Sequence, residues 1–321
     1  MSANNYKIAV VGAGAVGCFF GGMLARANHQ ISLIGRAARV KAINRSGLQM
    51  DCQRFQETVQ LNASTEIASV ADAEIILLCV KSYDTASTMQ AMRPYLDAES
   101  IVISLQNGVS NTELISAIVA NPVYAAAVYV AVAMADLNTV KHYGRGELQI
   151  GSFAHYQTNS STQPQALKKL IEQFSSAGVP CALSSDIQRE LWLKLLVNCS
   201  YNAISAIGQI SYGEMVEIPS IQALIAQLTK EFLLVASQAG VKISQAEADQ
   251  ANQTIARTMA GQKSSTAADL ARGKLTEIDF LNGYIVSKAR EYGLATPSNQ
   301  AVYALVKMFE VRATVLTNEF K

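Results

Sequence analysis

The chain has 321 residues, of which half are hydrophobic and 16% are charged, and its formal net charge is +1. This length predicts two domains, and the composition is typical of a globular protein with a large buried core. The nearly balanced charge gives no electrostatic reason to expect a nucleic-acid partner or binding to an anionic membrane.

The beginning of the sequence lacks the basic and apolar regions of a secretory signal, and the longest apolar run, 123–135, is too short to cross a membrane. We therefore expect a cytoplasmic protein. The five cysteines are scattered without a CxxC pair, which argues against disulfides and a metal site. Cys199, like most of the others, is expected to be a small core residue.

The first half of the chain alternates strand-like and helix-like patterns. Buried-strand runs are predicted at 6–11, 31–34, 73–80, 100–105 and 124–134, and helices at 15–27, from 84 to Pro94, and at 111–119. Continuous β-branched runs joined by helical crossovers indicate a mostly parallel sheet with helices on both faces. The segments 47–62 and 139–152 are predicted to be antiparallel additions.

The second half is predicted to be all-α. Helical patterns occupy 188–207, 220–239, 244–259 and 277–292, and four glycines are expected to interrupt them: Gly240, Gly261, Gly273 and Gly293. We expect an N-terminal α/β domain over 1–184 and a helical C-terminal domain over 185–321. An active site is expected in the interdomain cleft.

A glycine-rich sequence at 12–17 follows the first predicted strand and opens the first helix. Gly12 permits a tight turn, Gly14 lets a pyrophosphate approach the backbone, and Gly17 lets helix and sheet pack closely. The free N–H groups of the helix N-terminus favour phosphates. The pattern therefore predicts a Rossmann-type dinucleotide site formed by Gly12, Ala13, Gly14, Ala15, Val16 and Gly17. The alternative is a glycine-rich turn without a ligand.

The end of the second strand indicates which cofactor binds. Sites that prefer an unphosphorylated ribose place Asp or Glu about 20 residues after the glycines. Here residues 34–39 contain no acid but do contain Arg36 and Arg39. Because a guanidinium suits a phosphate, we expect NADPH, with Arg36 as the discriminating residue. Both arginines could instead be solvated loop residues, Arg39 more readily than Arg36.

Two more polar segments follow predicted strands, where ligands of parallel sheets bind. The first contains Lys81, which could balance the charge of cofactor phosphate or substrate. The second contains Asn107, which could hydrogen-bond the substrate or the nicotinamide ribose. Asn-Gly is also a common turn dipeptide, so either segment could be an ordinary turn.

Lys194, Asn198 and Asn202 recur every four residues in the first predicted helix of the second half. Residues with this spacing lie along one helix face. One ammonium and two carboxamides suit a small anionic substrate that is rich in oxygen. The alternative is a polar stripe on an amphipathic helix.

Together these features resemble the ketopantoate reductase (2-dehydropantoate 2-reductase) family. The motifs that carry the resemblance are the glycine loop at 12–17, Val80-Lys81, Leu105-Gln-Asn-Gly108, Trp192-Leu-Lys-Leu-Leu-Val-Asn198 with Asn202, Ser264-Ser265 with Asp269, and the segment 276–283. The resemblance implies an NADP-dependent oxidoreductase acting on a CH–OH group. Its reaction would be the reduction of 2-dehydropantoate to (R)-pantoate, a step towards pantothenate and coenzyme A.

The resemblance also implies residue roles. Lys194 and Glu277 are the implied catalytic residues, with Lys194 as the proton donor. The implied substrate-binding residues are Asn107, Asn198, Asn202 and Ser265. The implied cofactor-binding residues, besides the glycine loop, are Arg36, Lys81, Asn107 and Glu277. Glu277 could instead be a first-turn helix carboxylate after Thr276.

One position departs from the family pattern, because Thr266 stands where a methionine is common, and this change could alter the pocket. Two alternatives stay open: an NADP-dependent enzyme of the same architecture that acts on another small 2-oxo or β-hydroxy acid, and a nucleotide-binding sensor that does no chemistry. The sequence is compatible with a monomer or a homodimer.

Overall fold

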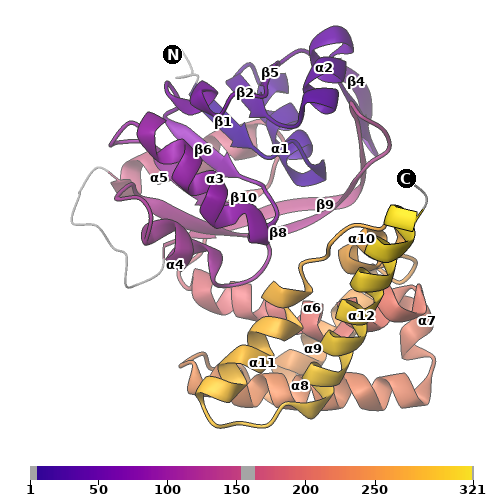
Figure 1. The fold of residues 1–321 in the computed structure, drawn as a ribbon. Coiled ribbons are helices and arrows are strands. Elements are labelled where there is room, and N and C mark those ends of the chain that lie inside the picture. The colour runs from indigo at the N-terminus through magenta and orange to yellow at the C-terminus, as the bar shows by residue number, and fades with distance from the viewer. Residues whose placement is uncertain (1–5, 153–162, 320–321) are drawn as a thin grey trace. The chain divides into compact units, whose positions relative to one another are not determined.

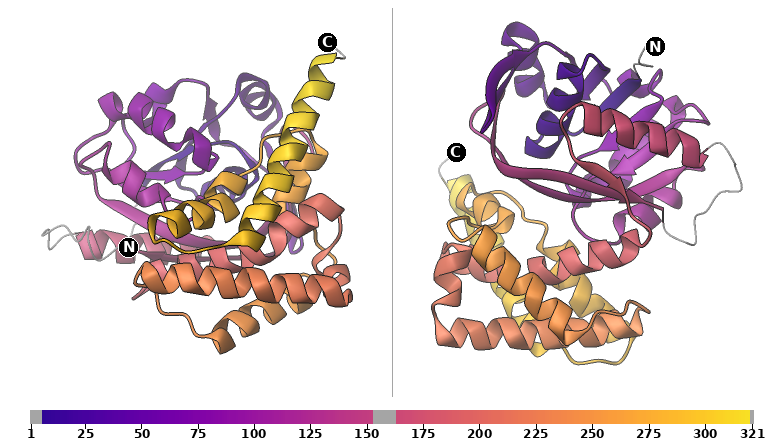
Figure 2. Two further views of the ribbon diagram at one scale, coloured as in Figure 1. Left: turned by 60° about the horizontal axis from the view of Figure 1, so that its bottom comes forward. Right: turned by 180° about the vertical axis from the view of Figure 1, so that it is seen from behind.

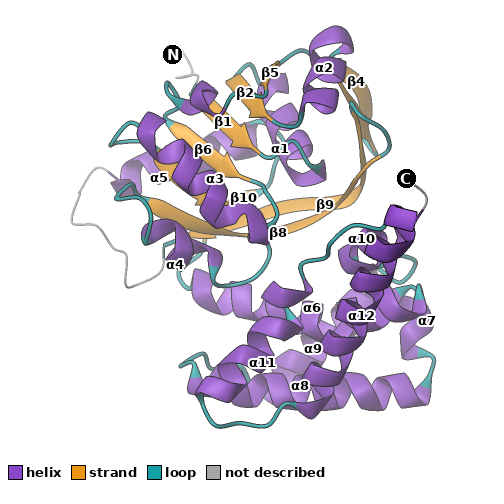
Figure 3. Ribbon diagram, in the orientation of Figure 1, coloured by secondary structure: helices purple, strands orange, loops and turns teal. Residues whose placement is uncertain are grey.

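The computed structural model describes residues 6–152 and 163–319 (Figure 1). Contacts within the chain divide it into two compact units, Met1–Ile187 and Gln188–Lys321. All strands of the described residues belong to the first unit, and the second is built from helices and loops (Figure 3). Each unit is described in turn.

The first unit contains a ten-stranded sheet with the order β4-β3-β9-β8-β7-β6-β1-β2-β5, and β10 pairs with β9. The six strands from β8 to β5 in this order are parallel to one another. The strands are β1 (Lys7–Val11), β2 (Gln30–Ile34), β3 (Leu48–Cys52), β4 (Phe55–Val59), β5 (Asn62–Ser64), β6 (Ile75–Leu78), β7 (Ile101–Ser104), β8 (Val123–Met134), β9 (Thr139–Gly151) and β10 (Cys181–Leu183).

Two apolar layers cover the two faces of this sheet, as the continuous β-branched runs predicted. On one face Phe20 and Phe174, from α1 and α5, meet edge to face with ring centroids 6.5 Å apart. On the other face Met89 and Ile115, from α3 and α4, are completely buried. The helices of this unit are α1 (Ala15–Arg26), α2 (Ala37–Ser46), α3 (Thr85–Met92), α4 (Asn111–Ser116) and α5 (Gln163–Ser176).

The additions to the parallel sheet only partly follow the predicted pattern. Strand β3 is antiparallel to β4, and β9 is antiparallel to β8, but β3 and β9 pair in parallel. The long strands β8 and β9 pass beside α1 (Figure 2). There the ring of Phe19 stacks on His142 with centroids 4.6 Å apart, which fixes α1 against this part of the sheet.

The second unit packs its helices around an aromatic and aliphatic core. Trp192 of α6 is buried and contacts Phe232 and Tyr284 with ring centroids 5.6 and 6.1 Å away. Gly240 and Gly293 follow α8 and α11 with positive φ, as expected of helix-ending glycines. The helices are α6 (Ile187–Gly208), α7 (Tyr212–Val216), α8 (Pro219–Gln238), α9 (Gln245–Thr258), α10 (Ser265–Ala271), α11 (Asn282–Glu291) and α12 (Pro297–Glu319).

One predicted helix, 277–292, is shorter than expected. The segment begins with a 3₁₀ turn, Ile278–Phe280, and α11 starts only at Asn282. Leu281 separates the two with φ −112° and ψ −108°, outside the helical region. In the described part of the chain, no helix is both long enough and apolar enough to span a membrane.

Candidate active site

The strand order of the first unit reverses between β1 and β6. The parallel strands extend from β1 through β2 to β5 on one side, and from β6 through β7 to β8 on the other. Ligands of open parallel sheets bind at the carboxyl ends of strands at such a point. Gly12 follows β1 there with φ +112°, and a Cβ atom on it would lie 2.6 Å from the carbonyl carbon of Cys79. The turn therefore requires glycine.

The other two loop glycines have opposite surroundings. A Cβ atom on Gly17 would collide with the carbonyl oxygen of Gly12, whereas one on Gly14 would meet no atom within 4 Å. Gly14 immediately precedes α1, and no side chain caps that helix. The open space at Gly14 and the uncapped N–H groups fit a pyrophosphate. The other predicted loop residues lie between these glycines: Ala13, Ala15 and Val16.

The two arginines after β2 are not equivalent. Arg39 donates hydrogen bonds from Nη1 to the carbonyl oxygens of Leu137 (2.9 Å) and Asp136 (3.3 Å), so it holds the turn between β8 and β9. Arg36 is exposed at the start of α2, and within residues 6–152 and 163–319 its guanidinium has no hydrogen bond or ion pair. Arg36 therefore remains available for a ligand at the carboxyl end of β2.

Lys81 and Asn107 lie in adjacent loops at the same edge of the sheet, after β6 and β7. The loops are joined because Ser82 donates a hydrogen bond to the carbonyl oxygen of Asn107 (3.0 Å) and Asn111 donates another (2.7 Å). The structure thus brings Gly12, Lys81 and Asn107 to the carboxyl ends of three neighbouring strands, as the sequence predicted.

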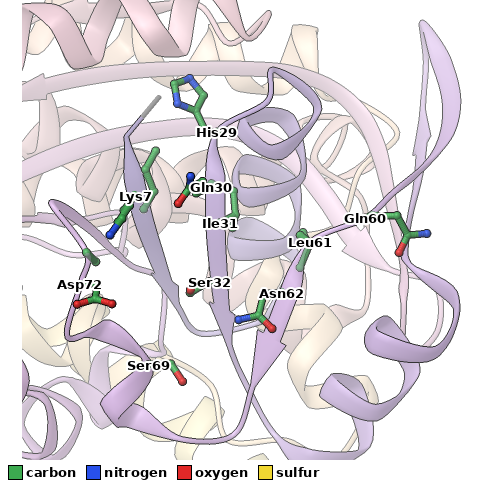
Figure 4. A pocket seen from close by; sticks show the side chains of 12 residues that line it. Lys7, His29, Gln30, Ile31, Ser32, Gln60, Leu61, Asn62, Ser69 and Asp72 are labelled. Atoms are coloured by element: carbon green, nitrogen blue, oxygen red, sulfur yellow. The ribbon is translucent and has the colours of Figure 1, made fainter. Parts of the chain in front are cut away.

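A polar pocket of about 470 Å³ lies at the opposite edge of the sheet (Figure 4). Lys7, Gln30 and Asn62, which line it, are the first residues of β1, β2 and β5. The pocket is therefore at the amino ends of the strands, away from the glycine loop. It does not contain any of the predicted site residues.

In the second unit, Lys194, Asn198 and Asn202 all lie on α6. Each step of four residues turns an α-helix by only about 40° beyond a full turn, so the three share one face. Asn202 is buried, and its Oδ1 accepts a hydrogen bond from the Tyr212 hydroxyl (3.3 Å). Burial raises the pKa of Tyr212, which keeps this donor protonated. The bond fixes the carboxamide so that its NH₂ group can donate to a ligand.

The predicted substrate serine lies at the start of α10. Ser264 precedes the helix and donates a hydrogen bond to the carbonyl oxygen of Asn202 (3.0 Å), and it accepts one from the N–H of Ala267 (3.0 Å). The bond to Asn202 anchors the helix to α6, and the bond from Ala267 caps the N-terminus of α10. Ser265 is exposed beside it, whereas Thr266 is buried. Thr266, the position that departs from the family pattern, therefore lies in the buried interior of the helical unit.

Glu277 is buried in a segment that is fixed on both sides to α12. On one side Thr276 donates from its N–H (2.8 Å) and its hydroxyl (2.6 Å) to Oε1 of Glu310. On the other side Asp279 forms an ion pair with Lys307 (2.9 Å). Glu277 occupies the N-cap position of the 3₁₀ turn, and its side chain makes no capping hydrogen bond there.

All five cysteines have free thiols; three are buried and two, Cys79 and Cys181, are partly buried. Cys199, on α6, is completely buried, and burial raises its pKa well above the usual value. Burial also raises the pKa of Cys18, next to the glycine loop, to about 11. Within the described residues, no group of three or more His, Cys, Asp or Glu side chains could hold a metal ion.

Several supporting residues were missed in the sequence. Asn111 and Tyr212 form hydrogen bonds with the predicted site residues Asn107 and Asn202, and Glu310 holds Thr276, the neighbour of Glu277. Each comes from a separate element, and none belongs to a recognised motif. Ser82 lies in a polar segment that follows a predicted strand, and this position is the one sequence feature that points to a role for it. None of these contacts has a periodicity or spacing in the sequence that would reveal it.

Comparison with known proteins covers both units. A family model described as "Ketopantoate reductase PanE/ApbA" matches residues 8–155, and one described as "Ketopantoate reductase PanE/ApbA C terminal" matches residues 186–310. The chain is 32% identical to the 2-dehydropantoate 2-reductase of Vibrio cholerae, over 95% of this chain and 98% of the relative. It is 30% identical to that of Halobacterium salinarum, over 94% and 98%.

Solved structures agree with this assignment. A PanE/ApbA family ketopantoate reductase from Ralstonia eutropha JMP134 is 43% identical and superposes with a TM-score of 0.88, over 96% of this chain and 99% of the other. A D-mandelate dehydrogenase solved with NADH and anilino(oxo)acetate, at 24% identity, shares the fold with a TM-score of 0.89. The predicted fold class, a Rossmann-type α/β domain followed by an all-α domain, is confirmed. The chain is an oxidoreductase that belongs to the ketopantoate reductase PanE/ApbA family.

Proposed function

We propose that this enzyme reduces 2-dehydropantoate to (R)-pantoate with NADPH. The observation that carries the proposal is the polar face of α6, where Lys194, Asn198 and Asn202 follow one another and Asn202 is fixed by Tyr212. Relatives that align over nearly their whole length are named 2-dehydropantoate 2-reductase. The substrate has a ketone, a carboxylate and a hydroxyl, and this face offers one cation and two neutral amides.

Lys194 is the proposed proton donor. NADPH supplies a hydride to the ketone carbon, so negative charge develops on the ketone oxygen. An ammonium held at that oxygen stabilises the charge and then transfers its proton, which completes the alcohol. We assign this role to Lys194 because it is the cation of the α6 face.

The asparagines and Ser265 are the proposed positioning groups for the substrate. Carboxamides donate and accept hydrogen bonds without adding a charge that would compete with Lys194 for the ketone oxygen. The NH₂ group of Asn202 has a fixed direction, because Tyr212 holds the carbonyl end of the same side chain. Asn198, one turn earlier, and the exposed hydroxyl of Ser265 are assigned to the substrate carboxylate and hydroxyl.

Glu277 is the proposed second catalytic residue. A buried carboxylate can orient an ammonium or accept a hydrogen bond from a substrate or ribose hydroxyl. The clamp formed by Thr276 and Glu310 restricts where this carboxylate can move. We therefore assign Glu277 to both catalysis and cofactor binding.

NADPH is the proposed cofactor, bound by the first unit. The support is the open loop at Gly14, the absence of an acid from residues 30–46 and the exposed guanidinium of Arg36. Lys81 and Asn107 complete the proposed cofactor contacts, and Asn107 also contacts the substrate. We further propose a cytoplasmic enzyme of pantothenate and coenzyme A biosynthesis that acts as a monomer or a homodimer.

A panel of small 2-oxo acids tests this proposal, with NADPH consumption followed by absorbance. We expect kcat/KM to be highest for 2-dehydropantoate, and higher efficiency with another 2-oxo acid would contradict the assigned substrate. Lys194→Ala should lower kcat by roughly a hundred- to ten-thousand-fold. Lys230→Ala, which removes an exposed lysine of α8, is the matched control and should leave kcat unchanged. Unchanged turnover in Lys194→Ala would remove Lys194 from the mechanism.

A further inference from the structure

We propose that Asn111 is a positioning residue for Lys81 and Asn107, and that it acts by fixing the two loops that carry them. This inference rests on the proposed function, because it concerns the same cofactor and substrate groups. Asn111 is the first residue of α4 and is only 4% exposed. Its side chain lies between the loop that follows β6 and the loop that follows β7.

The carboxamide of Asn111 joins these loops directly. Its Nδ2 group donates to the carbonyl oxygen of Asn107 (2.7 Å) and to the hydroxyl of Ser82 (3.3 Å). Its Oδ1 atom accepts a hydrogen bond from the hydroxyl of Thr85 (3.0 Å). Ser82 donates to the same carbonyl oxygen of Asn107 (3.0 Å). Two donors therefore converge on the backbone of Asn107, and one of them is the neighbour of Lys81.

A second buried amide extends the connection. Gln106 donates from Nε2 to the Thr85 hydroxyl (2.7 Å) and to the carbonyl oxygen of Val80 (3.1 Å), and its Oε1 accepts from Ser104 (3.0 Å). The residues whose side chains form this network are less than 5% exposed: Ser82, Thr85, Ser104, Gln106 and Asn111. A buried polar group costs free energy when it is unpaired. The arrangement of the two loops in which all of these buried groups are hydrogen-bonded is therefore favoured over others.

This arrangement determines where the predicted ligand contacts lie. Lys81 directly follows Val80 and directly precedes Ser82, and both of these neighbours belong to the network. Asn107 is held through its own carbonyl oxygen. A displacement of about 1 Å in a group that positions a ligand can lower the rate about a hundredfold. Asn111 touches neither ligand in this assignment and acts through the residues that do.

Asn111→Asp tests the proposal with little change of shape. It replaces the donor NH₂ with a carboxylate oxygen, which would face the carbonyl oxygen of Asn107. NADPH binding, followed by cofactor fluorescence, and kcat/KM for 2-dehydropantoate should both fall about tenfold to a hundredfold. The matched control is Thr112→Val at the next residue, where the buried Oγ1 has no hydrogen-bond partner in the described chain. Thr112→Val should match the wild type.

A double-mutant cycle separates positioning from general destabilisation. If Asn111 acts through Lys81, the effect of Asn111→Asp on NADPH binding should be smaller in the Lys81→Ala background than in the wild type. The proposal would be overturned if the losses of NADPH affinity caused by Asn111→Asp and by Lys81→Ala simply multiplied in the double variant. It would also be overturned if Asn111→Asp had the same kinetics as Thr112→Val.

If Asn111→Asp does not fold, Ser82→Ala removes one donor to Asn107 and should weaken NADPH binding several-fold. Unchanged binding in Ser82→Ala would then overturn the proposal. An inactive wild type would instead refute the proposed function.

Discussion

Gly17 packs directly on the carbonyl oxygen of Gly12, so closely that a Cβ atom at Gly17 would collide with it. The contact joins the first turn of α1 to the end of β1. Gly14, midway between them, faces open space. Two glycines of one motif therefore serve the fold, and the third serves the proposed ligand.

Alanine substitutions should separate these two roles. Gly17→Ala should destabilise the protein by several kcal/mol, as expected when a backbone contact cannot relax. Gly14→Ala should leave the thermal transition almost unchanged but weaken NADPH binding at least tenfold, because its methyl group occupies the proposed pyrophosphate space. Calorimetry and cofactor fluorescence measure the two effects. Tight NADPH binding by a folded Gly14→Ala variant would contradict the assigned pyrophosphate site.

Arg36 and Arg39 give a second matched pair. Arg36→Ala should raise KM for NADPH about ten- to a hundredfold, which corresponds to losing a charge-assisted contact, and should change KM for NADH little. Arg39→Ala should affect both cofactors equally, because Arg39 holds the turn at Leu137. Steady-state kinetics with each cofactor check both expectations. Equal losses of both cofactors in Arg36→Ala would show that Arg36 does not read the 2′-phosphate.

Local patterns were sufficient for most elements of the fold. The predicted strand 6–11 is observed as Lys7–Val11, and the predicted helix 188–207 as Ile187–Gly208. In both segments the apolar residues that gave the prediction are largely buried in the structure. The helix predicted at 277–292 began too early, because the contacts that hold residues 276–279 come from α12.

Contacts between distant parts of the chain could not be predicted. Asn282 donates a hydrogen bond to the carbonyl oxygen of Cys199 (2.9 Å), 83 residues away, and another to Oδ1 of Asn299 (3.0 Å). Any buried asparagine could satisfy such a carbonyl, and nothing in the sequence selects this one. The same holds for Asn111 and Tyr212, whose partners are defined only by the packing of whole elements.

The clamp on the Glu277 segment should affect both stability and catalysis. Thr276→Val removes the hydroxyl that donates to Glu310 and accepts from the N–H of Ile278 (3.2 Å). We expect the unfolding free energy to fall by about 1–3 kcal/mol, because buried partners lose their hydrogen bonds. The fluorescence of Trp192, the single tryptophan, reports unfolding of the helical unit.

Kinetics of the folded Thr276→Val variant complete this test. If the clamp positions Glu277, kcat should decrease even at temperatures where the variant is fully folded. Thr258→Val, on the exposed side of α9, removes a hydroxyl that bonds only within its own helix and serves as the control. A Thr276→Val variant with wild-type kcat would limit the clamp to a structural role.

Glu231 makes the helical unit sensitive to acid. This buried carboxylate accepts hydrogen bonds from the N–H groups of Ser298 (3.0 Å) and Asn299 (2.9 Å) and from the Asn299 side chain (2.9 Å). Burial alone would raise the pKa of Glu231, but these hydrogen bonds outweigh burial and lower it below the usual 4.5. Its charged form therefore stabilises the fold above pH 4.5, and this contribution is lost as the pH falls through the lowered pKa.

Glu231→Gln should remove this dependence. The glutamine NH₂ group would face an N–H donor, so the unfolding free energy at pH 7 should decrease by about 1.5–3 kcal/mol. The difference from the wild type should shrink as the pH falls from 4.5 through the lowered pKa of Glu231, because the unfolded wild-type chain binds the proton first and the folded carboxylate is protonated only at lower pH. Urea unfolding followed by Trp192 fluorescence measures both quantities. Glu291→Gln, at an exposed ion pair with Lys288, should change stability by less than about 1 kcal/mol at any pH. A constant difference between Glu231→Gln and the wild type across this pH range would show that Glu231 does not titrate on unfolding.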